Sequence, residues 1–218
     1  MVSHTALGAV IVPDVCVVDV VTLTEKSVYS VGKGDKMKAR FDERKATQVA
    51  GALLRRTGDH MNYMKLIKLM YIVDREALKR WGYTLTGDEY YALPHGPIVS
   101  RVYDMIADEP DLSSSVYWKD FITTQDYEVR LKQAVTDEAL ATAEVNLIAE
   151  VFQAYGHLNQ WQLKELTHTF PEWHDPNGGR LPIRYADILR GVGREDDAEQ
   201  VAGELEDLNF FAAALGVR

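Results

Sequence analysis

Apolar residues recur with helical spacing in four stretches of the 218-residue chain, and this pattern predicts a mainly helical protein. In each stretch the apolar residues lie three or four positions apart, so that they share one face of a helix. The residues on these faces are Ala46, Val49, Ala50, Leu53 and Leu54; Leu66, Leu69, Met70, Val73 and Ala77; Leu140, Ala143, Leu147, Val151 and Tyr155; and Ala198, Val201, Leu205, Leu208 and Leu215.

Capping residues set the bounds of the first two predicted helices. Asp42 can accept hydrogen bonds from the free N–H groups of a first turn, and Gly58 is a typical helix-ending residue. Asn62 can cap a second helix that ends near Trp81 and Gly82. Because the connection is short, we expect these two helices to form an antiparallel hairpin.

The middle of the chain predicts short strands. Residues 89–93 are rich in aromatics and read as a strand that Pro94 ends, and Pro97 suits the first turn of a helix running to about Ala107. Residues 116–123 and 127–132 are two further candidate strands, although no Asn, Gly or Pro marks a turn between them.

The second half returns to helices. Asp137 is the predicted cap of a helix that ends at Gly156, and a short helix follows from Asn159 to Thr167. Residues 171–182 read as a loop, 185–189 as a helical turn or two, and 195–215 as a final helix. The fold class is therefore mainly α (α+β), a compact helical domain with short β-strands or a β-hairpin.

Residues 1–36 differ from the rest and form a predicted N-terminal extension, either extended or disordered, before a helical domain at 37–218. Residues 8–23 are rich in valine, which favours strand. Three interpretations stay open: a β-hairpin packed on the domain, a disordered arm, or an artefact of an upstream start codon.

Charge is unevenly distributed. The net charge is −9, which makes nucleic acid an unlikely partner for the whole protein. Residues 38–80 nevertheless hold 11 Lys or Arg against 5 Asp or Glu, whereas residues 81–218 hold 10 against 24. We expect the two regions to pair mainly with each other inside the fold, the alternative being that each presents a charged face to a partner.

The sequence argues against several classes of protein. No apolar run approaches the length that spans a bilayer, and no secretory signal is evident at the start, so we expect a cytoplasmic protein without membrane contact. Cys16 is the one cysteine, which rules out an internal disulfide and a cysteine metal cage. It lies in a valine-rich run and reads as a small apolar residue.

The common catalytic motifs are missing. The chain has no Walker-type phosphate loop, no G-x-S-x-G elbow and no H-E-x-x-H pair. His168 and His174 lie six residues apart, which does not place them on one helix face, and a metal site would need further ligands such as Asp175 or His95. The sequence therefore predicts no catalytic residues, no metal and no cofactor.

A cluster of aromatic residues suggests protein binding instead. Tyr and Trp are enriched at binding hot spots, because they bury a large area at a small entropic cost. We nevertheless expect most of them to fill the core, and one or two to be exposed. The cluster consists of Tyr90, Tyr91, Tyr103 and Trp118.

Two stretches about 70 residues apart together resemble a known family. The first contains Lys65, Leu66, Lys68, Leu69 and Tyr71, followed by Tyr91, His95, Gly96 and Pro97; the second contains Thr167, His168, Pro171 and Trp173. In that order and spacing they resemble the Panacea domain, which includes SocA-like and phage-associated GepA-like proteins. The resemblance covers residues 41–192. The family usually has an aromatic or another basic residue in the slot of His95, so this position is a mild departure.

The resemblance implies a non-enzymatic antitoxin. Panacea domains neutralise unrelated toxins, many of them translation inhibitors, by direct protein contact, and some SocA-like members instead deliver the toxin to a protease. The implied partners are a cognate protein toxin and, for the adaptor alternative, a protease; a homo-oligomer is also possible. The acidic remainder of the chain could then mask a basic toxin surface.

The motif residues also make sense as scaffold. Pro171 and Trp173 can lock a long loop onto the core, and His168 can cap the preceding helix or bond to that loop. We therefore expect the motif to maintain stability while other surfaces recognise the partner. An alternative from another class is a metal-dependent hydrolase that uses His168, His174 and Asp175.

Overall fold

The computed structural model describes residues 41–107 and 116–214, and the expectation for residues 1–36 lies outside this part of the chain. The helices are α1 (Glu43–Leu54), the 3-10 turn η1 (Arg55–Thr57), α2 (Tyr63–Trp81), α3 (Ser100–Ala107), α4 (Val116–Phe121), α5 (Thr142–Tyr155), α6 (Gln160–His168), α7 (Tyr185–Gly191) and α8 (Ala198–Ala214). The strands are β1 (His60–Asn62), β2 (Tyr90–Leu93), β3 (Gly96–Val99), β4 (Ile122–Gln125), β5 (Glu128–Leu131) and β6 (Leu181–Ile183). The predicted mainly helical α+β class is confirmed.

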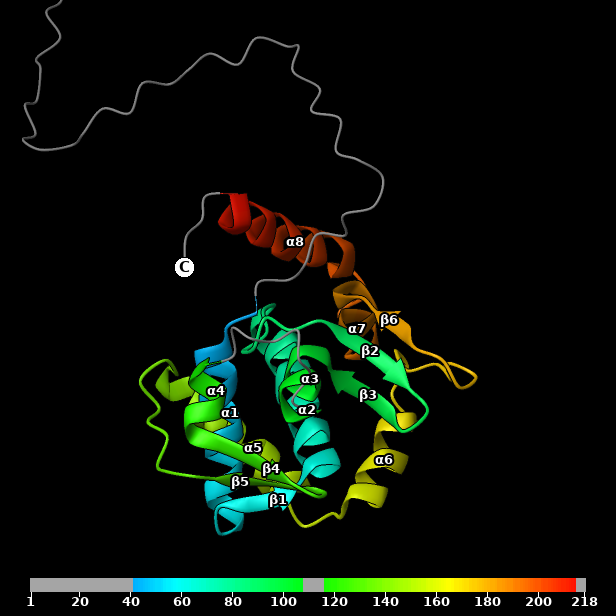
Figure 1. Cartoon of the computed structure of the whole chain (residues 1–218). Coiled ribbons are helices and arrows are strands. Elements are labelled where there is room, and N and C mark those ends of the chain that lie inside the picture. The colour runs from blue at the N-terminus through cyan, green and yellow to red at the C-terminus, as the bar shows by residue number, and fades with distance from the viewer. Residues whose placement is uncertain (1–40, 108–115, 215–218) are drawn as a thin grey trace, which may run out of the picture. The chain divides into compact units, whose positions relative to one another are not determined.

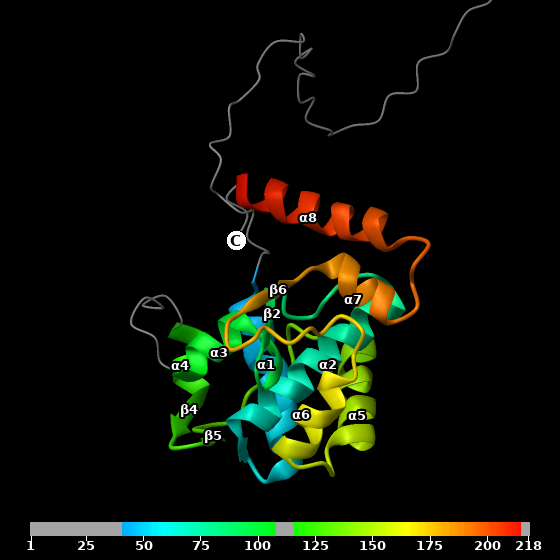
Figure 2. The ribbon, with the colours of Figure 1, turned by 90° about the vertical axis from the view of Figure 1, so that its right-hand side faces the viewer.

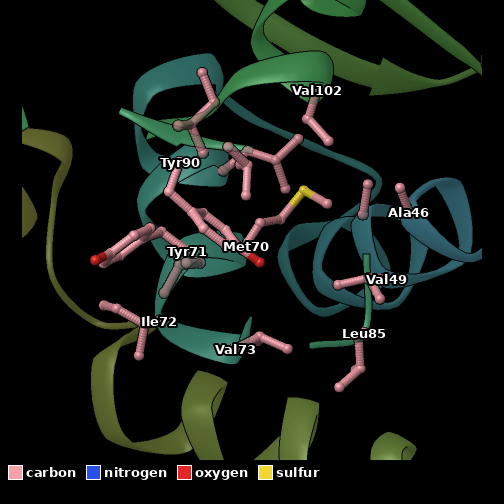
Figure 3. Packing of buried hydrophobic residues seen from close by; sticks show 14 of the residues in the cluster. Ala46, Val49, Met70, Tyr71, Ile72, Val73, Leu85, Tyr90 and Val102 are labelled. Carbon is pink, nitrogen blue, oxygen red and sulfur yellow. The ribbon is translucent and has the colours of Figure 1, made fainter. Parts of the chain in front are cut away.

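Helix α2 is the central element of the domain. It packs against α1, α5, α6, α7 and β3, and Figures 1 and 2 show it surrounded by these neighbours. The predicted caps are present, because the Asn62 side chain accepts from Met64 N and Lys65 N and Gly82 ends the helix in a left-handed conformation. Leu66, Leu69 and Met70 are fully buried, and Figure 3 shows Met70 pointing toward Ala46 and Val49 of α1.

Two small antiparallel sheets lie beside the helices. One has the strand order β1-β5-β4 and the other β3-β2-β6. In the second sheet Tyr90 pairs with Val99 and Leu93 with Gly96, so β2 and β3 form a hairpin whose turn is Pro94–His95. The third strand of this sheet, β6, comes much later in the sequence, and its Ile183 pairs with Tyr90 of β2. This sheet adjoins α2 and α6 and positions the motif residues.

Two predicted helix starts and one predicted element type are wrong, each because of a contact with a residue far away in the sequence. Pro97 lies in β3, and the helix begins at Ser100, where the Asp88 carboxylate accepts from Arg101 N and Val102 N. Residues 116–121 form a helix instead of a strand, because the Trp118 side chain is buried there and the Trp118 backbone N–H donates to the Glu43 carboxylate.

The second wrong helix start is that of α5. Asp137 does not cap this helix, since its carboxylate accepts from Arg55 at 2.6 Å. The helix begins at Thr142, and the Glu144 side chain returns to Ala141 N at 2.9 Å. The short strands β1 and β6 were also missed, because three residues are too few to show a period.

Ion pairs join the basic front helices to the acidic remainder. Five cations of α1, η1 and α2 each meet a carboxylate between residues 137 and 172, as the self-pairing interpretation predicted. The pairs are Arg44–Glu138, Lys45–Glu144, Arg55–Asp137, Arg75–Glu172 and Arg80–Glu150. Much of the charge asymmetry is therefore neutralised within the domain.

Candidate functional site

The two motif stretches meet around α2. We define the motif cluster as Lys68 of α2, Gly96 at the start of β3, Thr167 and His168 of α6, and Trp173 in the loop after it. Helix α6 packs on both α2 and β3, so residues a hundred positions apart come together, and Figure 1 shows α6 beside both elements.

Lys68 lies at the centre of this cluster. It is 1% exposed, and its Nζ donates to the carbonyl oxygen of Pro97 at 2.6 Å. Burial, with a further contribution from Lys164, lowers the pKa of Lys68 to about 7. Lys68 is therefore enclosed by its own domain, and its hydrogen bond joins the β2–β3 hairpin to α2.

Gly96 allows this close approach. Its φ is +94°, a conformation that side chains other than glycine rarely adopt. A Cβ atom here would lie 2.8 Å from Thr167 Oγ1 and 2.9 Å from Lys68 Nζ. Glycine is therefore required both by the turn and by the packing of three elements at one point.

Trp173 lies in the loop that follows α6 and contacts both this helix and β2. Its Nε1 donates to the carbonyl oxygen of Leu93 at 3.3 Å, and its ring stacks on His168 with centroids 3.8 Å apart. His168 thus contacts the loop through its ring face. Its Nε2 is buried without a hydrogen-bond partner among the described residues, and burial lowers the pKa of His168. The neighbouring Pro171 is exposed.

A buried carboxylate beside the cluster was missed at the level of the sequence. Glu172 accepts from Tyr71 OH at 3.0 Å and from Arg75 Nε at 2.7 Å, and its side chain is fully buried. Arg75 also donates to the Gly191 carbonyl and lies over the Phe170 ring. Burial raises the pKa of Tyr71 well above its ordinary value. No local pattern signals this triad, because Glu172 lies about a hundred residues from Tyr71 and Arg75.

Two further buried acids hold the segment between α2 and β2. Asp74 accepts from Leu85 N, Thr86 N and Tyr90 OH, and burial raises its pKa. Asp88 caps α3, and burial raises its pKa to about 7. Both carboxylates bind backbone N–H groups of this domain, which indicates a structural role.

The remaining motif residues divide between core and surface. Leu66 and Leu69 are fully buried, whereas Lys65 Nζ donates to the Gly156 carbonyl at 2.6 Å. Arg180 lies 3.6 Å from the centroid of the half-buried Tyr91 ring. His95 is exposed in the β2–β3 turn.

Most of the predicted aromatic cluster belongs to the core. Tyr90 and Trp118 are 3% and 1% exposed, and Tyr91 and Tyr103 are half-buried. A more exposed aromatic residue, Trp161 in the first turn of α6, was missed as a binding candidate. It is 56% exposed, and its ring meets His95 edge to face with centroids 6.1 Å apart.

The geometry does not favour metal chemistry. His168 is stacked on Trp173, while Asp175 accepts from Asn177 N in an exposed turn. Among residues 41–107 and 116–214, no three His, Cys, Asp or Glu side chains are grouped so that they could hold a metal ion. The hydrolase alternative based on His168, His174 and Asp175 therefore gains no support from their placement.

Comparison with known proteins identifies the family. No helix in the described part of the chain is long and apolar enough to cross a membrane. No curated protein and no solved structure matches the chain. The family model for the antitoxin SocA-like, Panacea domain matches residues 66–174, which is half of the 218 residues and includes every member of the motif cluster. The chain belongs to the SocA-like Panacea domain family of antitoxins.

Proposed function

We propose that this protein is the antitoxin of a toxin–antitoxin pair and that it neutralises its cognate toxin by direct protein contact, without catalysis. The observation that carries the proposal is the match to the antitoxin family over the segment that forms the motif cluster. A toxin that inhibits translation would place this activity in the cytoplasm.

The state of the polar groups in and beside the motif cluster supports binding rather than catalysis. Lys68 of the cluster and the neighbouring Glu172 are buried and engaged with groups of the same domain. Catalytic groups need access to a substrate and a reacting atom within hydrogen-bond reach. These residues therefore stabilise the scaffold, and the recognition of a partner falls to exposed side chains.

Co-expression with the adjacent open reading frame tests the proposal. The product of that frame should stop growth when expressed alone, should be harmless together with this protein, and should elute with it as one complex. A harmless neighbour, or a toxic one that this protein neither binds nor neutralises, would refute the proposal. The same assay in a protease-deficient strain separates the adaptor alternative, since rescue by direct binding persists there and rescue by proteolytic delivery is lost.

A further inference from the structure

We propose that the motif cluster is a proton-operated latch. Helix α6 and the loop up to Trp173 stay closed on α2 and β3 while Lys68 and His168 are uncharged, and they open as these two groups take up protons. The ligand of the latch is the proton itself. The inference concerns a property of the fold and does not depend on the proposed antitoxin function.

Three elements meet closely at the cluster. Lys68 Nζ of α2 and Thr167 Oγ1 of α6 lie 2.9 Å and 2.8 Å from the position that a Cβ atom of Gly96 in β3 would take. His168 is the next residue of α6, and its ring is stacked on Trp173. A charge that forms on Lys68 or His168 therefore forms inside this joint, where it is poorly solvated.

Neither basic group has a partner that would compensate a positive charge. A lysine ammonium has three N–H donors, but Lys68 Nζ has one acceptor, the Pro97 carbonyl oxygen. His168 Nε2 is buried without a hydrogen-bond partner. Within the part of the chain that the structure describes, neither side chain forms an ion pair. Protonation of either group thus places an unpaired charge in the joint, and this is costly.

The charges on α6 and on the loop after it act on both groups. Burial lowers the pKa of Lys68 to about 7, and the charge of Lys164 contributes to the shift. Burial also lowers the pKa of His168, and both lysines act in the same direction. The carboxylates of Glu165 and Asp175 oppose this shift without cancelling it. The closed joint therefore disfavours a proton on Lys68 and on His168.

The other sides of Lys68 supply no compensating acid. Strand β3 has no titratable side chain, and His95 in the turn before it is exposed. On α2, Lys65 lies one turn before Lys68 and is a further cation, whose Nζ donates to a backbone carbonyl. Tyr71 lies one turn after Lys68 and donates to Glu172, whose carboxylate is held in the triad described above. Neither element therefore provides a counter-ion.

The sign of the pH dependence follows from the open state. Once α6 and the loop are detached, the pKa values of Lys68 and His168 approach those of exposed side chains, about 10.4 and 6.5. The open state then binds protons that the closed state does not bind, so that a falling pH favours opening. Lys68 drives this effect from about pH 10 to pH 7, and His168 adds to it below about pH 6.5.

Helix α6 is suited to open before the rest of the domain. It has nine residues, of which Leu163 and Thr167 are buried, whereas the 19-residue helix α2 has buried residues along most of its length. Short helices are marginally stable by themselves, and elements with few buried apolar contacts open locally at the lowest free energy. The latch therefore holds an element that little else holds.

Hydrogen exchange of the full chain, followed by mass spectrometry between pH 8.5 and pH 5.5, tests the latch. After correction for the intrinsic pH dependence of exchange, residues 160–173 should exchange faster than residues 43–54 of α1 at each pH. The opening constant of residues 160–173 should rise about 20-fold from pH 8.5 to pH 6.5, because the open state gains the proton of Lys68.

Lysine variants test the cause of this rise. Lys68→Met should lose most of it, since methionine does not titrate. Lys164→Gln should make it smaller, because the variant removes a positive charge that lowers the pKa of Lys68. Lys79→Gln is the matched control, since Lys79 is exposed and lies about 16 Å further along α2, and it should leave the rise unchanged.

Histidine variants test the second group. His168→Phe keeps an aromatic ring against Trp173 and should remove the part of the rise that appears below about pH 6.5. His157→Phe, at an exposed position, should keep this part.

The outcomes decide between a latch and ordinary unfolding. If residues 160–173 exchange no faster than α1 at any pH, the opening is global and the latch is wrong. Equal pH dependence in Lys164→Gln and Lys79→Gln would overturn the role of the clustered charges. If Lys68→Met does not fold, the Lys164 and His168 variants decide, and the latch is refuted when both retain the wild-type pH dependence.

Discussion

Replacement of Gly96 by alanine should destabilise the domain strongly, because two costs add at one position. A side chain at a φ of +94° costs about 1–2 kcal/mol. The new Cβ would also lie 2.8 Å from Thr167 Oγ1 and 2.9 Å from Lys68 Nζ, and overpacking of this kind costs about 1–3 kcal/mol. We therefore expect Gly96→Ala to lower the free energy of unfolding by about 2–5 kcal/mol, measured by urea denaturation followed through tryptophan fluorescence.

Gly58→Ala is the matched control. Gly58 has a φ of +74°, but a Cβ there would meet nothing within 4 Å, so only the backbone cost of about 1–2 kcal/mol applies. In a Thr167→Ala background the loss caused by Gly96→Ala should shrink, because one of the two close contacts is gone. The reasoning is refuted if Gly96→Ala costs no more than Gly58→Ala, or if the Thr167 background leaves its cost unchanged.

Three further predictions concern the groups around the cluster. Glu172→Ala should lower the free energy of unfolding by about 3–5 kcal/mol, because it leaves the mostly buried charge of Arg75 without its carboxylate partner. Glu150→Ala breaks an exposed ion pair and should lower the free energy of unfolding by less than about 1 kcal/mol. Equal urea midpoints for the two variants would contradict this prediction. Trp173→Ala should cost about 2–4 kcal/mol, and a stably folded variant that has lost toxin binding would contradict the scaffold role. Burial lowers the pKa of Lys68 to about 7, so that above this pH the unfolded state binds more protons than the folded state. The free energy of unfolding should therefore rise from about pH 7 to pH 9, by up to ~1.4 kcal/mol per pH unit. Urea titrations at several pH values should show this rise in the wild type, and the prediction fails if Lys68→Met shows the same rise.

The periodic parts of the fold could be predicted from the sequence. The stripe of Leu66, Leu69 and Met70 on α2 and the caps at Asp42 and Asn62 depend on neighbours within a few residues, and all are present. The wrong predictions concern elements whose bounds depend on a residue far away in the sequence. Asp88 starts α3 from outside that helix, and no local pattern contains this information.

The candidate site divides in the same way. The motif pointed to Lys68, Gly96 and Trp173, but their contacts with one another became evident only once α6 was placed against α2 and β3. The buried position of Glu172 could not be predicted, because the sequence around this residue gives no sign of the hydrogen bonds that it accepts from Tyr71 and Arg75. Trp161 was passed over since exposure cannot be read from residue type alone.

The central claim, that this chain neutralises by stoichiometric contact, is tested most directly in a cell-free translation reaction inhibited by the purified product of the adjacent frame. Increasing amounts of this protein should restore translation in proportion to the amount added, with full recovery at a fixed molar ratio. Full recovery at amounts far below the toxin, or no recovery at molar excess, would contradict the account.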